Sequence, residues 1–246
     1  MEEKILILDF GSQYTQLIAR RIRELNIYCE IFPFNKIPEI SSEYVGIILS
    51  GSPFSVHDKD SPKINFEAFN NLPVLGICYG AQLIAKENDC VVAKSEIREY
   101  GRAKLSYVDS DSLLMNGVEL DSDVWMSHGD SITEINDSFQ VLASTKDVKI
   151  TSYHLTKKNY FGLQFHPEVT HSAFGRKILD NFTVKICGCS QSWNSERFIE
   201  YTIQQIRDTV KDDKVVLGLS GGVDSSVAAM LIHKAIGKNL FCVFVD

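Results

Sequence analysis

Short apolar runs of four to six residues recur through the first eighty residues, separated by longer and more polar segments. The runs are residues 4–9, 28–32, 45–49 and 74–77, and their length and apolar content are typical of buried strands. Residues 16–25 carry Leu17, Ile18, Ile22 and Leu25 at helical spacing. Arg20, Arg21 and Arg23 lie largely off that face, so we expect them to be solvated. Strands that alternate with helices predict a doubly wound, mostly parallel α/β sheet.

The pattern changes between residues 91 and 165, where short apolar runs are separated by Asp, Ser, Asn and Gly. The runs are residues 103–108, 124–126, 141–143 and 150–153, and they predict antiparallel strands at one edge of the sheet. Residues 175–187 predict a closing helix. We therefore expect a first domain that spans residues 1–190.

A polar stretch at residues 190–195 precedes a second α/β pattern. Residues 196–210 predict an amphipathic helix, and residues 215–219, 227–236 and 240–245 predict a strand, a helix and a strand. A single β-α-β unit cannot bury its own sheet. We therefore expect residues 191–246 to be a linker helix and the truncated start of a second α/β domain.

Composition narrows the classes of protein that remain possible. The net charge is −7 and there is no basic tract, which argues against a nucleic-acid partner. We find no signal peptide and no apolar run long enough to cross a membrane. The six cysteines form no disulfide framework and no Cys-x-x-Cys pair, which fits a reducing compartment. We expect a cytoplasmic protein with small-molecule substrates and no metal site.

Cys78 lies between a predicted strand and a predicted helix, with Gly76 two residues before it and Gly80 two residues after it. This Gly-x-Cys-x-Gly pattern is the thiol counterpart of the nucleophile elbow. The N–H groups and the positive dipole end of the following helix favour a thiolate at this position. Without a base, Cys78 would be interpreted as one more buried small hydrophobe.

His166 is the one histidine of six with an acid placed to orient it, in the sequence His166-Pro167-Glu168. We expect a strand to continue through this segment, because Pro167 favours an extended residue before it. Residues i and i+2 of a strand point to the same side, so Glu168 would hold one imidazole nitrogen of His166. Alone, these three residues are a weak signal that would more often be a surface turn. Together with Cys78 they predict a Cys-His-Glu catalytic triad.

Acyl transfer also needs donors for an oxyanion. One candidate is the backbone N–H of Tyr79, directly after the nucleophile. The other is the turn Gly51-Ser52-Pro53, which on its own could be a plain β-turn.

A Gly-rich and hydroxyl-rich loop follows the first strand of the second pattern. It consists of Ser220, Gly221, Gly222, Val223, Asp224, Ser225 and Ser226. Such a loop before a helix can bind phosphate through backbone N–H groups and hydroxyls, although it lacks the lysine of a Walker A loop. The alternative is a simple strand–helix turn.

Two family resemblances rest on these motifs. Residues 76–82 with His166-Pro167-Glu168 resemble the class I glutamine amidotransferases, and residues 220–226 resemble the pyrophosphate loop of the N-type ATP pyrophosphatases. The two in this order are similar to the glutamine-hydrolysing GMP synthetase family, with further support from residues 8–16, 124–130 and 165–171.

The resemblance implies that Cys78 attacks the side-chain amide of glutamine, with His166 as base and then acid, and Glu168 orienting it. Glutamine hydrolysis would need no cofactor. The residues implied to hold glutamine are Gln82, Ser127, His128, Gly129 and Asp130, with Asp130 suited to the α-ammonium group. The oxyanion would be bound at Gly51, Ser52 and Tyr79.

For the longer family members, the resemblance implies ATP and Mg²⁺ as cofactors and XMP as the acceptor that becomes GMP, with AMP and pyrophosphate released. The loop at residues 220–226 would hold the pyrophosphate portion of ATP. A homodimer would form through a C-terminal region that this chain lacks. We therefore expect this chain by itself to hydrolyse glutamine at most, and not to make GMP.

One departure and three alternatives remain. The family usually has Gly-Gly-Pro where this chain has Gly51-Ser52-Pro53, and a serine at positive φ would be strained. The alternatives are a glutaminase for another acceptor, a non-catalytic regulatory domain and a cysteine peptidase. The loop at residues 220–226 disfavours a glutaminase for another acceptor. The intact triad disfavours a non-catalytic regulatory domain, and the implied glutamine-binding segment at residues 127–130 disfavours a cysteine peptidase.

Overall fold

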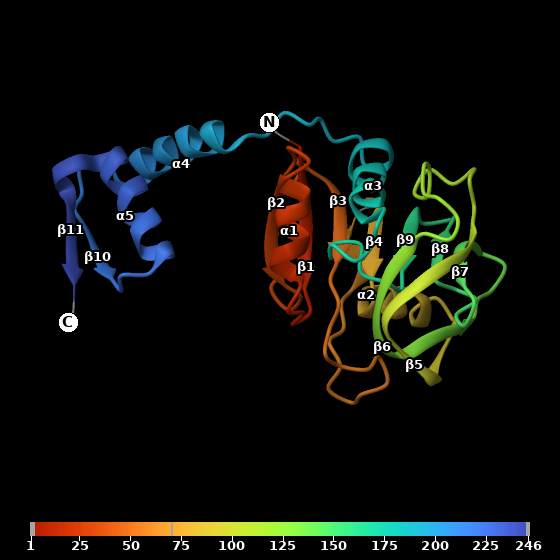
Figure 1. Cartoon of the computed structure of the whole chain (residues 1–246). Coiled ribbons are helices and arrows are strands. Elements are labelled where there is room, and N and C mark those ends of the chain that lie inside the picture. Colours follow the sequence, from red (N-terminus) through yellow and green to blue (C-terminus); the bar gives the residue numbers. More distant parts are fainter. Residues whose placement is uncertain (1–2, 70, 245–246) are drawn as a thin grey trace. The chain divides into compact units, whose positions relative to one another are not determined.

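The computed structural model describes residues 3–69 and 71–244 (Figure 1). The chain forms two compact units, residues 1–192 and 193–246. Each unit is described by itself below.

The first unit is built on a mixed sheet with nine strands among the described residues, in the order β2-β1-β3-β4-β9-β8-β7-β5-β6 (Figure 1). The strands from β2 to β9 in this order pair in parallel, and the remaining pairs are antiparallel. The strands are β1 (Lys4–Asp9), β2 (Tyr28–Pro33), β3 (Tyr44–Leu49), β4 (Val74–Ile77), β5 (Val91–Val108), β6 (Asp123–Glu134), β7 (Phe139–Thr145), β8 (Ser152–Leu155) and β9 (Tyr160–Leu163). The predicted parallel sheet with an antiparallel edge is confirmed.

Helices cover both faces of this sheet because alternate side chains of each central strand enter different cores. Ile5 and Ile7 of β1 pack in the core that receives α1 (Thr15–Arg23) and α3 (Gly175–Asp180). Leu6 and Leu8 pack in the opposite core, with α2 (Tyr79–Lys86) and the short 3₁₀ helix Phe66–Phe69. The closing helix is not uniform, since α3 continues as a π-helical segment, Asn181–Ile186.

Strand β5 differs most from its predicted extent. It has 18 residues, and it pairs first with β6 and then with β7. Only its last six residues were predicted as a strand, because the earlier part carries many charged residues that break the apolar pattern. Gly101, at φ +115°, lies inside the strand.

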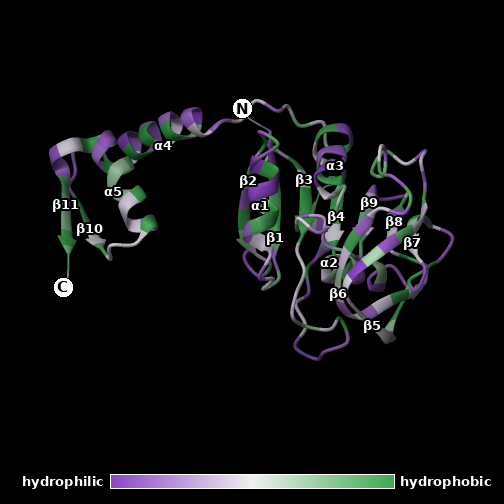
Figure 2. Ribbon diagram, in the orientation of Figure 1, coloured by the Kyte–Doolittle hydropathy of each residue, from purple (hydrophilic) through white to green (hydrophobic). Residues whose placement is uncertain are grey.

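The second unit contains α4 (Ser195–Val210), β10 (Val215–Leu219), α5 (Val223–Ile236), a 3₁₀ turn at Gly237–Asn239 and β11 (Leu240–Phe244). Strands β10 and β11 pair in parallel. Helix α4 carries polar and apolar bands, as an amphipathic helix should (Figure 2). None of the described residues from 193 to 244 is buried, as expected for one β-α-β unit without further layers. No helix in the described parts of the chain is long and apolar enough to cross a membrane.

Candidate active site

Cys78 occupies a sharp turn between β4 and α2, with φ 53° and ψ −105°. The two flanking glycines are required by close packing. A Cβ atom on Gly76 would lie 2.5 Å from the Ala81 nitrogen, and one on Gly80 would lie 2.7 Å from Cβ of Leu49. The cysteine itself therefore adopts the costly backbone conformation, while the glycines let the strand and the helix approach each other.

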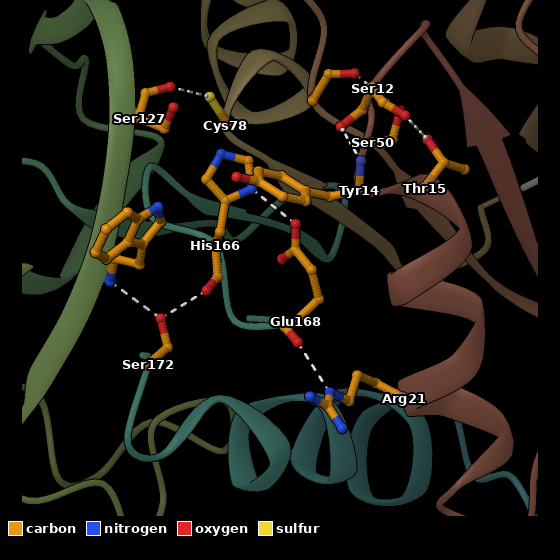
Figure 3. A network of polar contacts seen from close by, with 12 residues as sticks. Ser12, Tyr14, Thr15, Arg21, Ser50, Cys78, Ser127, His166, Glu168 and Ser172 are labelled. Atoms are coloured by element: carbon orange, nitrogen blue, oxygen red, sulfur yellow. Dashed lines mark hydrogen bonds and ion pairs between the residues drawn. The ribbon is translucent and has the colours of Figure 1, made fainter. Parts of the chain in front are cut away.

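His166 and Glu168 lie in the turn after β9 and not in a strand. The expected strand through residue 168 is wrong, since β9 ends at Leu163 and residues 167–168 form a turn. The contact is present nevertheless, with His166 Nδ1 2.7 Å from Glu168 Oε1 (Figure 3). The Ser172 hydroxyl donates to the His166 carbonyl at 2.6 Å and accepts from the Trp125 N–H at 3.0 Å. These bonds fix the His166 backbone against strand β6.

Glu168 is completely buried, and Arg21 of α1 holds its backbone. Arg21 Nε donates to the Glu168 carbonyl at 2.9 Å (Figure 3). Arg21 Nη1 also lies 2.8 Å from Glu24 Oε2. The expectation that Arg21 is simply solvated is wrong. Sequence periodicity could not find this contact, because it joins residues 147 positions apart.

The electrostatics of His166 favour its protonated form. Burial acts to lower the pKa of His166, but hydrogen bonds and charge interactions with Cys78 and Glu168 outweigh it and raise the pKa to about 10. A protonated imidazole next to Cys78 stabilises a thiolate, which is the nucleophilic form of cysteine.

Cys78 and His166 line one cavity of about 600 Å³. The structure brings the residues predicted for the glutamine site together there, except that Glu168 lies behind His166 and does not line the cavity. Those that share the cavity are Gly51, Ser52, Cys78, Tyr79, Gln82, Ser127, His128, Gly129, Asp130 and His166.

Several lining residues were missed by the sequence analysis. Tyr14 places its ring edge-on to His166 with 5.1 Å between ring centroids, and Ser55 donates a hydrogen bond to the Asp130 carboxylate (Figure 3 shows Tyr14). Lys94 and Tyr100 of β5 also line the cavity. They fall in the part of β5 that was not predicted as a strand, so no pattern placed them near Cys78.

The wall formed by β6 is held by backbone and amide contacts. Gln82 Nε2 donates to the Asp130 carbonyl at 2.7 Å and to Gln164 Oε1 at 3.2 Å. His128 Nδ1 lies 2.9 Å from the same carbonyl, and burial lowers the pKa of His128. The Cys78 thiol donates to the Ser127 carbonyl at 3.6 Å.

The turn at Gly51-Ser52 does not carry the expected strain, because Ser52 is not at positive φ. The Ser52 hydroxyl donates to the Phe10 carbonyl at 2.8 Å, and the Ser50 hydroxyl accepts from the Phe10 N–H at 3.0 Å. A Cβ atom on Gly51 would lie 3.4 Å from His166 Cε1, so the turn approaches the imidazole closely.

In the second unit, the loop at residues 220–226 gathers hydroxyl groups at the start of α5. The hydroxyls of Ser220 and Ser225 are 3.2 Å apart, and those of Ser225 and Ser226 donate to the Gly222 carbonyl at 3.0 and 2.9 Å. Gly221 has φ +77°, a conformation that suits glycine. No group of three or more His, Cys, Asp or Glu side chains suited to a metal ion occurs among the described residues.

Comparison with known proteins agrees with this arrangement. The family model described as glutamine amidotransferase class-I matches residues 6–186, and the model described as NAD synthase matches residues 195–245. The chain belongs to the class I glutamine amidotransferase family. Its curated relatives include proteins named GMP synthase [glutamine-hydrolyzing] from Cytophaga hutchinsonii, 58% identical, and GMP synthase [glutamine-hydrolyzing] 1 from Bacteroides thetaiotaomicron, 56% identical. Both matches cover 100% of this chain but only 48% and 49% of the relatives, so the chain spans about half their length.

Solved structures agree on the fold. A putative GMP synthase subunit from Thermoplasma acidophilum superposes with a TM-score of 0.65 at 29% identity, covering 82% of this chain and 98% of that one. PurLQS from Thermotoga maritima superposes with a TM-score of 0.60, covering 76% of this chain and 100% of that one. At 18% identity, the second likeness concerns the fold alone.

Proposed function

We propose that this chain carries the glutamine-hydrolysing site of a GMP synthase, with Cys78, His166 and Glu168 as its catalytic triad. The observation that carries the proposal is the placement of Cys78 at the elbow, in one cavity with a His166 ring that Glu168 holds at 2.7 Å. The likeness to relatives named GMP synthase supports the further proposal that the released ammonia is used to form GMP.

The triad geometry suits thioester chemistry. The Cys78 sulfur attacks the side-chain amide carbon of glutamine, and the carbonyl oxygen becomes an oxyanion held by N–H groups of Tyr79 and the Gly51-Ser52 turn. His166 then donates its proton to the leaving nitrogen, which departs as ammonia. In the second half, His166 takes a proton from water as that water attacks the thioester, and glutamate and the thiolate are released.

The amino-acid end of glutamine would lie against β6. The Asp130 carboxylate faces the cavity and suits the α-ammonium group, with Gln82 and residues 127–129 completing the wall. The Ser55 hydroxyl donates to the same carboxylate and orients it.

The loop at residues 220–226 would serve the second half-reaction of a longer protein. Its hydroxyls and N–H groups fit the pyrophosphate portion of ATP, as the donor set in the structure suggests. ATP with Mg²⁺ would supply the adenylation of XMP, and ammonia would then form GMP. We further propose that the longer protein is a cytoplasmic homodimer.

The triad is tested with an electrophilic glutamine analogue, intact mass measurement and peptide mapping. We expect a single adduct on Cys78, no adduct on Cys78→Ala, and an unchanged adduct on Cys90→Ala, which alters another buried cysteine. A folded wild-type chain that gains no adduct, or gains one elsewhere, would contradict the proposal.

The proposed use of ammonia to form GMP is tested on a longer protein that includes this chain. Cys78→Ala should abolish GMP formation from glutamine while ammonia still supports it. If ammonia plus XMP and ATP gives no GMP with the wild-type protein, the acceptor is a different one.

A further inference from the structure

Gln164 is buried directly behind the nucleophile. It lies one residue beyond β9, is 1% exposed, and its backbone N–H donates to the Thr151 carbonyl at 2.8 Å. Its side-chain Nε2 lies 3.9 Å from Cys78 Sγ, within reach of a hydrogen bond to a large sulfur atom. The triad chemistry described above makes no use of this contact.

The direction of the Gln164 amide is fixed by its neighbours. The Asp130 carbonyl can only accept, so the Gln82 atom 2.7 Å from it must be the donating nitrogen. That same nitrogen lies 3.2 Å from the Gln164 side chain, which must therefore present its oxygen there. The Gln164 nitrogen is then turned toward Cys78. The chain of contacts runs from a backbone carbonyl through two buried amides to the sulfur.

We propose that Gln164 is a positioning residue for the nucleophile, whose amide N–H donates to the Cys78 sulfur and favours the thiolate. An N–H donor stabilises a negatively charged sulfur more than a neutral thiol or a thioester. The contact therefore helps before the attack on glutamine and again when the sulfur leaves the thioester. The inference rests on the proposed role of Cys78 as nucleophile.

Gln82 connects the contact between Gln164 and Cys78 to the proposed glutamine site. It lines the cavity where glutamine is proposed to bind, and it fixes the Gln164 amide. Substitution of Gln82 should therefore weaken the Gln164 contact without touching the sulfur directly.

The test measures how the rate of Cys78 alkylation by iodoacetamide depends on pH, by intact mass and peptide mapping. Other titratable groups that line the same cavity are Tyr14, Tyr79, Lys94, Tyr100, His128, Asp130 and His166, and none of them is substituted in the variants. In Gln164→Met, which keeps the size but removes the donor, we expect the midpoint to rise by about one pH unit. The rate below the midpoint should fall about tenfold, the lower end for a hydrogen bond to a charged group.

Two further variants complete the test. Gln140→Met is the matched control, since Gln140 is exposed and its amide bonds Asp109, away from the cavity; its midpoint should equal that of the wild type. Gln82→Met should shift the midpoint in the same direction by a smaller amount, and it serves as the test if Gln164→Met does not fold. An unchanged midpoint in the folded Gln164→Met protein, or failing that in Gln82→Met, would overturn the inference. Iodoacetamide needs no glutamine site, so this result is independent of labelling by the glutamine analogue.

Discussion

Glu168 acts on His166 inside the protein, where water does not weaken the interaction. Its side chain is completely buried, and Oε1 contacts the imidazole while Oε2 has no hydrogen-bond partner among the described residues. A buried carboxylate with one free oxygen is costly unless its charge is used. The protonated His166 supplies the opposite charge.

Glu168→Gln should lower activity because it leaves His166 without its negatively charged partner. We expect glutamine hydrolysis to fall by about 10²–10⁴-fold, the range for loss of acid–base catalysis. Steady-state ammonia release measures it. A loss of less than threefold would show that Glu168 does not orient the base.

The same substitution should also change how stability depends on pH. The folded pKa of His166 is about 10, above its ordinary value of about 6.5, so its contribution is fully present below pH 6.5 and lost as the pH rises through 10. Glu168→Gln lowers the folded pKa. The difference in unfolding free energy between the two proteins should be largest below pH 6.5 and shrink toward pH 10, as denaturant titrations would show.

Ser52 offers a prediction at another single position. Ser52→Ala removes the hydroxyl that donates to the Phe10 carbonyl, so the free energy of unfolding should fall by about 1 kcal/mol. Thermal or denaturant unfolding measures this, with the exposed Ser110→Ala as control. Equal stability of Ser52→Ala and the control would mean that the hydroxyl does not hold the turn.

At the scale of elements, the sequence predicted the parallel core well and the antiparallel edge poorly. Strands β1, β3 and β4 are largely buried apolar runs, which a linear pattern shows directly, and the shorter apolar run of the edge strand β2 was also found. The charged first part of strand β5 pairs with β6 and its last residues pair with β7, so the extent of β5 depends on partners further along the chain. The predicted site residues could be named from motifs, whereas Arg21, Tyr14 and Gln164 required the folded chain.

The elbow between β4 and α2 leads to a prediction about close packing. Gly76→Ala places a Cβ atom 2.5 Å from backbone atoms that cannot move aside easily, so the free energy of unfolding should fall by about 3 kcal/mol. Gly218→Ala is the control, because nothing lies within 4 Å of its added Cβ. Melting curves of the two variants measure this difference. Equal losses of stability would show that close packing at the elbow does not require glycine at position 76.

At the scale of the whole molecule, the two units differ in how deeply their residues are buried. The first has cores on both faces of its sheet, whereas the described residues of the second are at most half-buried. Large apolar side chains such as Val216, Met230 and Phe244 are exposed on the second unit. Such surfaces call for additional chain or a partner to cover them.

Limited trypsin digestion should therefore cut the second unit first. Arg197 and Lys211 are both exposed in and after α4, and cleavage there should leave a resistant core that ends near residue 197. Mass spectrometry of the time course identifies the core, which should still react with the glutamine analogue at Cys78. Early cleavage within residues 4–186 would contradict this order.

The backbone conformation of Cys78 carries a cost in stability that only the proposed chemistry would justify. A residue other than glycine at φ 53° and ψ −105° costs about 1–3 kcal/mol, and glycine would remove that cost. Cys78→Gly should therefore melt at a higher temperature than Cys78→Ala, although neither variant should hydrolyse glutamine; equal melting temperatures would argue against the strain. In a lineage that no longer needs the reaction, selection for stability alone would favour glycine at this position. A cysteine at this position is thus favoured by the proposed chemistry and opposed by the backbone conformation.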